Sequence, residues 1–258
     1  MGLIGGSLGY QILRRVAGGG GGRGAAMDGS VYATRSKLEV LLGAGVWDAI
    51  RGRTVVDFGC GEGEEVVEMA SRGAAAVVGV DIQSRMLDIA RARAERAGVA
   101  DRCRFVEVHD GRADVIVSVD AFEHFDDPAA MLRLMHGMLA PGGKVLVSFG
   151  PTWYHPLGGH LFSVFPWAHL LFTERALIRW RSDFKTDGAT RFREVAGGLN
   201  QMTIGRFERI VAASPLRFAS FEAVPIRKLH RLSNRLTREV TTAIVRCTLV
   251  AREPAAAA

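Results

Sequence analysis

The chain has 258 residues, of which 48% are hydrophobic and 23% are charged, a composition typical of a globular protein. Three widely spaced cysteines, Cys60, Cys103 and Cys247, exclude a disulfide framework and a cysteine-rich zinc site. No apolar run reaches the ~18–20 residues that a membrane-spanning helix needs. We therefore expect a cytoplasmic protein without a transmembrane segment.

Positive charge is in slight excess. The 33 basic and 27 acidic residues give a formal net charge of +6, without a dense basic run. Since nucleic-acid binding usually needs a concentrated basic patch, we expect no nucleic-acid partner. An anionic substrate remains compatible with this surplus.

The first 29 residues differ in composition from the rest. A mildly apolar stretch over residues 1–16 is followed by five consecutive glycines at 18–22, a composition typical of flexible linkers. We therefore expect a flexible glycine-rich extension over 1–29, with Met27 as an alternative start, and a globular domain over 30–253.

Short apolar runs then alternate with helical patterns. Continuous apolar strands that alternate with helices of ~10–15 residues are typical of a parallel sheet covered on both faces. We therefore predict an α/β fold with a Rossmann-like, doubly wound sheet. The expected strands are 54–58, 76–80, 104–108, 114–119 and 144–149, and the expected helices are 36–42, 64–71, 84–97 and 128–139.

This alternation ends at Gly150. An aromatic-rich insertion over 151–202 follows, which we expect to act as a lid after strand five. Its apolar run 161–172 suits buried packing, a lid over an acceptor, a dimer surface or a shallow membrane contact. The remaining expected elements are helices 174–181 and 203–213, and strands 216–224 and 241–250 joined by a basic helix 227–238.

The strongest motif is Val55-Val56-Asp57-Phe58-Gly59-Cys60-Gly61-Glu62-Gly63, a glycine-rich turn between a strand and a helix. Glycines without Cβ atoms let a ligand approach the backbone closely. The carboxylates of Asp57 and Glu62 would repel a pyrophosphate but suit a ligand with an ammonium and a sulfonium. Asp81 follows the second strand, where an acid can accept hydrogen bonds from ribose hydroxyls.

These residues resemble the class I S-adenosylmethionine-dependent methyltransferases, especially the type 11 branch. The resemblance covers about 54–150, and it includes Asp114 to Phe125 and Leu139-Ala140-Pro141-Gly142-Gly143. It implies a seven-stranded sheet whose last strand is antiparallel, and S-adenosylmethionine as cofactor. The alternative is a nicotinamide enzyme, which the acid before the glycines and the Pro-Gly-Gly turn disfavour.

The resemblance also assigns roles to residues. Asp57 and the glycines would line the methionine moiety, Asp81 would hold the ribose, and Ile82 would pack on the adenine. Family members usually have a longer segment between strands three and four, so Asp110 is the candidate acid for the adenine amino group. The expected cofactor-binding residues are Asp57, Gly59, Cys60, Gly61, Gly63, Asp81, Ile82, Asp110 and Asp120.

Three polar side chains follow the fourth strand. His124 is a candidate general base, because an imidazole can accept a hydroxyl proton near neutral pH. Together, Asp120, Glu123 and His124 also match the acid-x-x-Glu-His spacing of ubiquinone-pathway O-methyltransferases. That spacing resembles a divalent-metal site and leaves Mg²⁺ as a second, less favoured cofactor.

The segment after strand five is expected to lie over the acceptor. His155 and His160 are alternative bases. Trp153 and Tyr154 are expected to form a pocket wall. Arg175 and Arg179, spaced four residues apart on one helix face, are expected to hold a phosphate or carboxylate of the acceptor.

The sequence therefore predicts an S-adenosylmethionine-dependent methyltransferase that acts on a small, amphipathic or anionic acceptor, at a hydroxyl oxygen. Methylation at carbon or nitrogen is the alternative reaction. A non-catalytic, cofactor-binding partner subunit is the alternative class.

Overall fold

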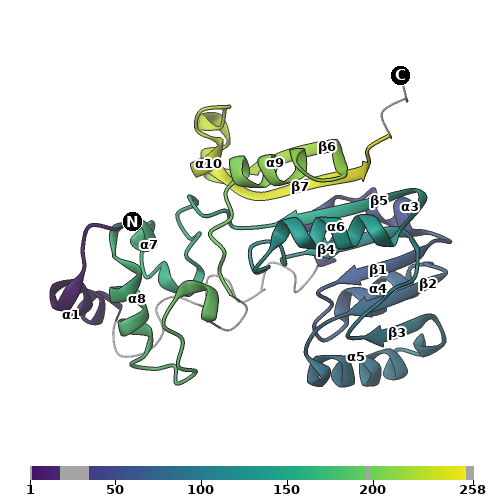
Figure 1. Cartoon of the computed structure of the whole chain (residues 1–258), viewed down its shortest axis with the longest axis horizontal. Helices are drawn as coiled ribbons and strands as arrows, with labels where there is room; N and C mark the ends of the chain where they lie inside the picture. The colour runs from purple at the N-terminus through teal and green to yellow at the C-terminus, as the bar shows by residue number, and fades with distance from the viewer. Residues whose placement is uncertain (1, 18–34, 196–197, 254–258) are drawn as a thin grey trace.

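The structure, a computed structural model, describes residues 2–17, 35–195 and 198–253. Within these ranges, seven strands form one sheet in the order β3-β2-β1-β4-β5-β7-β6 (Figure 1). Neighbouring strands from β3 to β5 are parallel, whereas β7 is antiparallel to both β5 and β6. This confirms the predicted seven-stranded, Rossmann-like sheet with an antiparallel last strand. The strands are β1 (Thr54–Phe58), β2 (Ala76–Val80), β3 (Cys103–Val106), β4 (Ala113–Val119), β5 (Leu139–Phe149), β6 (Leu216–Pro225) and β7 (Thr242–Ala251).

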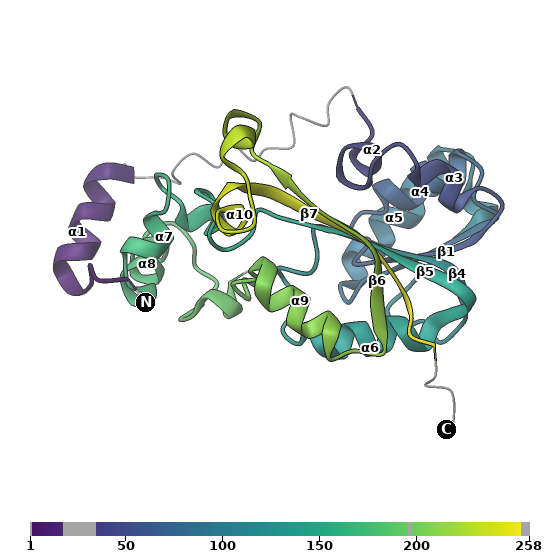
Figure 2. The same ribbon diagram turned by 90° about the horizontal axis from the view of Figure 1, so that it is seen from above.

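Helices cover both faces of the sheet, as Figure 2 shows. Successive strand residues point to opposite faces, so Val55 packs into one apolar core and Val56 into the other. The first core is covered by α2 (Lys37–Leu42), α3 (Val46–Ile50), α4 (Glu64–Ser71) and α5 (Ser84–Arg96), followed by a short helix η3 (Ala100–Arg102). The second is covered by α6 (Pro128–Met138) and α9 (Ile204–Ala212).

Local capping explains several helix boundaries. Ser36 accepts a hydrogen bond from the Glu39 N–H at 3.2 Å, so α2 begins at the next residue. Asp127 accepts one from the Ala130 N–H at 2.9 Å and caps α6. The bounds of β1, β2, α4 and α8 (Glu174–Arg181) are those expected from the sequence.

The connection between β6 and β7 differs from the expected single helix over 227–238. It consists of a short helix η6 (Arg227–Leu232) and a separate short helix α10 (Arg238–Thr241). Asn234 interrupts them, because its side-chain oxygen accepts hydrogen bonds from the Leu236 and Thr237 N–H groups at 2.8 and 3.2 Å. Such local bonds compete with helical ones.

The insertion after β5 forms a lobe with its own apolar core, beside the sheet in Figure 1. In the run 161–172, Phe162 and Phe172 are buried while Leu171 is exposed, so most of the run serves packing. The lobe contains η4 (His160–Phe162), α7 (Ala168–Leu171), α8 and η5 (Phe192–Glu194).

The expectation of a flexible extension over 1–29 is wrong for its first part. Residues 6–17 form α1 (Gly6–Ala17), which packs on α8 and buries Leu13 completely in the lobe core. The preceding segment is fixed as well, since the Ile4 N–H donates to the Leu171 carbonyl at 3.0 Å. The glycine run and Met27 lie outside the described residues.

None of the helices in the described ranges is long and apolar enough to cross a bilayer.

Candidate active site at the carboxyl end of the sheet

The glycine-rich turn joins β1 to α4. Gly59, Gly61 and Gly63 have φ angles of +90°, +49° and +74°, a region that favours glycine. The Gly59 N–H donates to the Val80 carbonyl at 2.9 Å, which fixes the turn against β2. A Cβ atom on Gly63 would lie 2.6 Å from the Cβ of Ala90, so this glycine also permits close packing of α4 on α5.

Asp81 lies beside this turn, at the end of β2. Its two carboxylate oxygens accept hydrogen bonds from the Gly61 and Gln83 N–H groups, both at 2.9 Å. Each oxygen retains a further lone pair for a ligand hydroxyl. The neighbouring Ile82 side chain is 88% exposed, so it offers an apolar surface next to the carboxylate.

Asp57 lies beneath the turn and is only 2% exposed. Its Oδ2 atom has no hydrogen-bond partner among the described residues. Burial raises the pKa of Asp57 well above its ordinary value, and the nearby Glu65 carboxylate raises it further. A buried carboxyl oxygen without a partner favours a ligand that brings a cation or a donor.

Lys37 is a site residue that the sequence analysis missed. Its ammonium lies 3.0 Å from Glu65 and 3.1 Å from Asp120. Burial acts to lower the pKa of Lys37, but the two carboxylates outweigh it and raise the pKa above its usual value. The lysine follows the capping residue of α2, and only tertiary packing brings it to the sheet edge.

Cys60 and Asp110 contribute less than expected to a ligand surface. Cys60 is buried, and its sulfur lies against Gly79 of β2 and 3.8 Å from the Gly61 carbonyl oxygen, so its side chain offers little surface to a ligand. Asp110 is exposed on the short loop after β3. Its expected contact with the adenine stays a prediction.

His124 is held in one tautomer. Its Nδ1 atom lies 2.8 Å from the Gly198 carbonyl, which can only accept a hydrogen bond. Nδ1 therefore carries the proton, and Nε2 keeps a free lone pair. In this tautomer the neutral ring can accept a proton at Nε2, and the Gly198 carbonyl, from a segment distant in the sequence, selects it.

The expected metal ligand set is not assembled. Asp120 is paired with Lys37, whereas the ligand atoms of Glu123, His124 and His160 lie within 4.8 Å of one another. A single carboxylate with two imidazoles suits a transition metal better than Mg²⁺, which prefers oxygen ligands. The predicted Mg²⁺ site therefore does not fit, and we derive no step through it.

Glu123 is 2% exposed and accepts a hydrogen bond from the Gly150 N–H at 3.2 Å. Burial, followed by the charge of Asp120, raises its pKa to about 8. This carboxyl is therefore largely protonated at neutral pH.

The other two candidate bases are less suited. His155 accepts a hydrogen bond from the Leu157 N–H at its Nδ1 atom, at 2.9 Å. Its proton then lies on Nε2, so the neutral ring has no free lone pair. The ring centroid of His160 lies 5.4 Å from that of His124, and burial lowers the pKa of His160 to about 4. It is therefore a weak proton acceptor.

A pocket of about 400 Å³ lies between the end of β4 and the lobe, and we call it the acceptor pocket. His124 and His160 line one part of it, and Arg181, Lys185 and Asp187 line another.

Neither of the expected aromatic wall residues lines this pocket. Trp153 is 5% exposed and packs against His169 and Phe192 in the lobe core. Tyr154 is exposed, and its carbonyl accepts a hydrogen bond from the Trp167 indole at 3.0 Å. Arg175 and Arg179 line a separate groove along α8.

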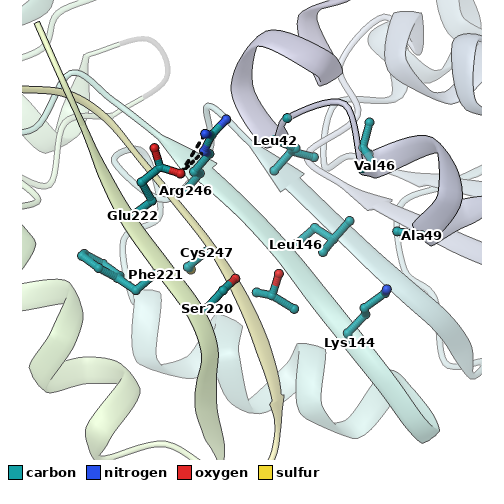
Figure 3. Close-up of a pocket in the computed structure, with 13 residues that line it drawn as sticks. Leu42, Val46, Ala49, Lys144, Leu146, Ser220, Phe221, Glu222, Arg246 and Cys247 are labelled. Atoms are coloured by element: carbon teal, nitrogen blue, oxygen red, sulfur yellow. Dashed lines mark hydrogen bonds and ion pairs between the residues drawn. The ribbon is translucent and has the colours of Figure 1, made fainter.

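A further hollow of about 520 Å³ lies between α2, α3 and strands β5 to β7 (Figure 3). Its Arg246 and Glu222 form an ion pair at 2.7 Å, so these two charges compensate each other. It contains none of the predicted site residues, and we assign it no role in the reaction.

Comparison with known proteins supports the predicted class, a methyltransferase. Residues 56–147 match a family model described as a methyltransferase domain, of type 11. The ubiquinone biosynthesis O-methyltransferase of Pseudomonas paraeruginosa is 37% identical over 105 residues, which are 38% of this chain and 45% of the relative. That of Neisseria meningitidis is 38% identical over 106 residues, 38% of this chain and 44% of the relative. The match thus spans less than half the length of these curated relatives.

Solved structures share the fold. Magnesium protoporphyrin IX methyltransferase from Synechocystis, with bound S-adenosylmethionine, has a TM-score of 0.54 at 17% identity and covers 95% of this chain and 92% of its own. An S-adenosylmethionine-dependent methyltransferase from Mesorhizobium loti has a TM-score of 0.51 at 18% identity, covering 78% and 92%.

The sheet order and the glycine turn together define a class I, Rossmann-like methyltransferase fold. Residues 56–147 match the methyltransferase domain of type 11, so the resemblance seen in the sequence is confirmed. The family match also favours this class over the nicotinamide alternative.

Proposed function

We propose that the chain transfers a methyl group from S-adenosylmethionine to a hydroxyl oxygen of a small-molecule acceptor. The observation that carries this proposal is the fixed tautomer of His124, whose Nε2 lone pair belongs to a residue lining the acceptor pocket. When bound, S-adenosylmethionine supplies an electrophilic methyl group on its sulfonium.

The turn region fits such a cofactor. The unpartnered Asp57 oxygen would accept a hydrogen bond from the ammonium, and Asp81 would accept bonds from the ribose hydroxyls. Ile82 offers an exposed surface for the adenine ring. Lys37 would pair with the carboxylate of the methionine moiety. Asp120 would then neutralise this lysine from the other side.

The proposed reaction is an in-line displacement that needs alignment and one proton acceptor. The acceptor hydroxyl lies against His124, and its proton passes to Nε2 as the new oxygen–methyl bond forms. S-adenosylmethionine would supply the methyl group to that oxygen and would leave as adenosylhomocysteine. Gly198 keeps the Nδ1 proton in place, so the resulting imidazolium remains hydrogen-bonded.

A His124→Asn variant tests this role. Transfer of a labelled methyl group would be measured with a panel of phenols and alcohols, with the exposed His230→Asn as matched control. Loss of a general base should lower kcat by about 10²-fold or more. Affinity for adenosylhomocysteine should not change. An unchanged kcat would reject the base and favour carbon or nitrogen methylation, whereas binding without transfer to any acceptor would favour a partner subunit.

We also propose that the protein works in the cytoplasm, since Cys60, Cys103 and Cys247 are all free thiols. Cell fractionation tests this placement, and recovery in an oxidising compartment would contradict it.

A further inference from the structure

The groove along α8 carries an excess of positive charge. It has a volume of about 1140 Å³ and opens on the surface of the lobe. Four of its lining residues are cations, Arg175, Arg179, Lys185 and Arg191, whereas Glu174 is the carboxylate among them. We call this surface the basic groove.

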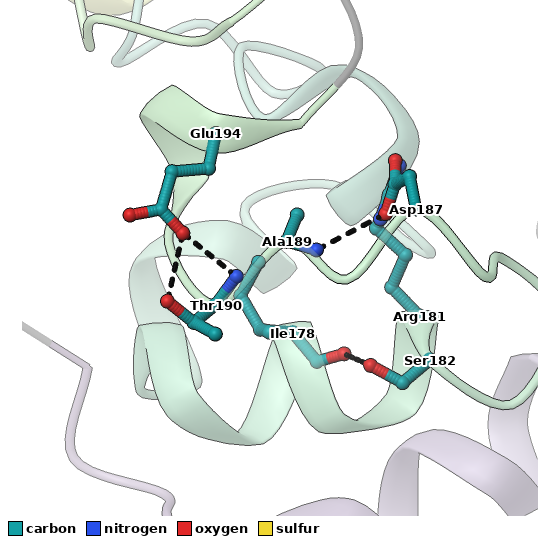
Figure 4. Close-up of polar contacts among 7 residues, drawn as sticks. All are labelled: Ile178, Arg181, Ser182, Asp187, Ala189, Thr190 and Glu194. Carbon is teal, nitrogen blue, oxygen red and sulfur yellow. Dashed lines mark hydrogen bonds and ion pairs between the residues drawn. The ribbon is translucent and has the colours of Figure 1, made fainter.

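The carboxylates around this groove have other partners, two of which are drawn in Figure 4. Asp187 accepts hydrogen bonds from the guanidinium of Arg181, at 2.6 Å for Nη1. Glu194 accepts bonds from the Thr190 N–H and hydroxyl at 2.9 and 2.7 Å. Glu174 accepts one from the Phe192 N–H at 2.6 Å.

Glu174 and Glu194 keep their negative charge, because their hydrogen-bond partners are neutral. The pKa of Glu194 is lowered mainly by its bonds to Thr190 and also by the charges of Arg191 and Arg193, so Arg191 is partly compensated, but the groove retains an excess of positive charge. In the part of the chain that the structure describes, none of the four cations of the groove forms an ion pair within 4.0 Å. Like charges gathered in one concave surface repel one another and concentrate a positive potential. An anion of more than one charge would relieve this repulsion.

One arginine of the groove is already held in place. The guanidinium of Arg179 lies 4.2 Å from the ring centroid of Tyr10, a residue of α1. Tyr10 is fixed in turn by a hydrogen bond from its hydroxyl to Asp183 at 3.0 Å. A guanidinium that is positioned before binding loses less entropy when it contacts an oxyanion.

The basic groove adjoins the acceptor pocket. Lys185 lines both of them, and its backbone N–H is anchored to the Arg181 carbonyl at 3.0 Å. A molecule with its hydroxyl beside His124 can therefore extend past Lys185 toward Arg175 and Arg179.

We propose that the methyl acceptor carries a phosphate or diphosphate group that binds in the basic groove, while its hydroxyl-bearing part occupies the acceptor pocket. Arginine forks match the oxygen geometry of phosphate groups. This inference rests on the proposed methyltransferase function. It adds the chemical class of the acceptor and makes Lys185 the residue that links the two subsites.

Calorimetric titration with inorganic pyrophosphate at constant ionic strength tests the groove without an acceptor. The test variant is Arg175→Glu/Arg179→Glu. The matched control is Arg104→Glu/Arg217→Glu, which changes the net charge equally at exposed positions on β3 and β6. We expect the groove variant to weaken pyrophosphate binding by at least about tenfold, and the control by less than about twofold. Equal weakening in both variants, or no binding by the wild type, would overturn the proposal.

Adenosylhomocysteine binding measured on the same samples separates the two hypotheses. If adenosylhomocysteine binds but pyrophosphate does not, only the groove proposal fails. If neither binds, the proposed methyltransferase function fails with it.

A second arm compares acceptors. A phenol with a phosphate ester on its side chain should be methylated with a KM at least about tenfold below that of the same phenol with a free alcohol. Lys185→Ala should remove most of this difference in KM between the two phenols. A third acceptor is the same phenol attached to an anionic lipid. If its KM equals that of the phosphorylated phenol, the subsite recognises the phosphate alone. If its KM is lower, the acceptor is carried on a lipid. Equal KM values for all three acceptors would contradict the proposal.

Discussion

Replacing Asp81 with Asn tests the glycine turn as the cofactor site. Both carboxylate oxygens of Asp81 accept hydrogen bonds from backbone N–H groups, one from Gly61 and one from Gln83. An amide has a single acceptor oxygen, so its NH₂ group would face one of these donors in either orientation. The substitution therefore disturbs the turn and also removes the charged acceptor for the ribose.

The expected effect follows from these lost bonds. Leaving one N–H without its charged partner costs about 1–3 kcal/mol of folding stability, in the free and in the bound protein alike, so this loss does not enter Kd. Weakening the charged hydrogen bonds to the ribose costs up to about 3 kcal/mol of binding free energy, which corresponds to a roughly 100-fold increase in Kd.

Calorimetry with adenosylhomocysteine measures this change, with thermal unfolding as a check that the variant folds. The exposed Asp101→Asn is the matched control for the loss of one negative charge. A folded Asp81→Asn protein that binds within about twofold of the wild type would refute the assignment of this carboxylate.

Three further substitutions test the site and the lobe. Burial lowers the pKa of His169 to about 4, below its unfolded value, so its stability contribution is present above pH 6.5 and lost as the pH falls toward 4. Between pH 7 and 5 the share of His169 in this loss amounts to about 2 kcal/mol. His155 and His160, whose pKa values are also lowered to about 4, keep their shares in the variant, so urea unfolding should show a loss in His169→Gln that is about 2 kcal/mol smaller than in the wild type. Leu13→Ala should lower the free energy of unfolding by about 2–5 kcal/mol, whereas the exposed Leu8→Ala should change it by less than about 0.5 kcal/mol; equal effects would contradict the packing of α1. Gly63→Ala should destabilise the protein by about 1–3 kcal/mol in thermal unfolding, because its Cβ would meet Ala90, and a neutral result would contradict that contact.

The cofactor half of the fold could be predicted because its signals are local. The run from Val55 to Gly63 combines a buried strand, a turn that needs positive φ angles and a helix start within nine residues. Asp81 follows the same logic at the next strand. In such segments the conformation of each residue depends mainly on its neighbours along the chain, so a single sequence is enough to predict the structure.

The missed features depend on contacts between distant segments. Lys37 reaches Asp120 across 83 positions only after α2 packs on the sheet. The helix α1 was not predicted, because the segment is followed by a glycine-rich run and because α8, on which it packs, lies more than 150 residues away in the sequence. Trp153 was expected at the acceptor because it is aromatic, but an insertion of this size needs its own core, and that core takes the indole.

The bond from His124 to Gly198 connects the proton acceptor to the insertion. The same segment is held by Asn200, whose amide donates hydrogen bonds to the carbonyls of Phe122 and Phe125, both at 2.7 Å. If this segment moved, the imidazole would lose the carbonyl that selects its protonation pattern, and the ring could turn. The protonation pattern of the candidate base at the sheet edge therefore depends on how the insertion packs against it.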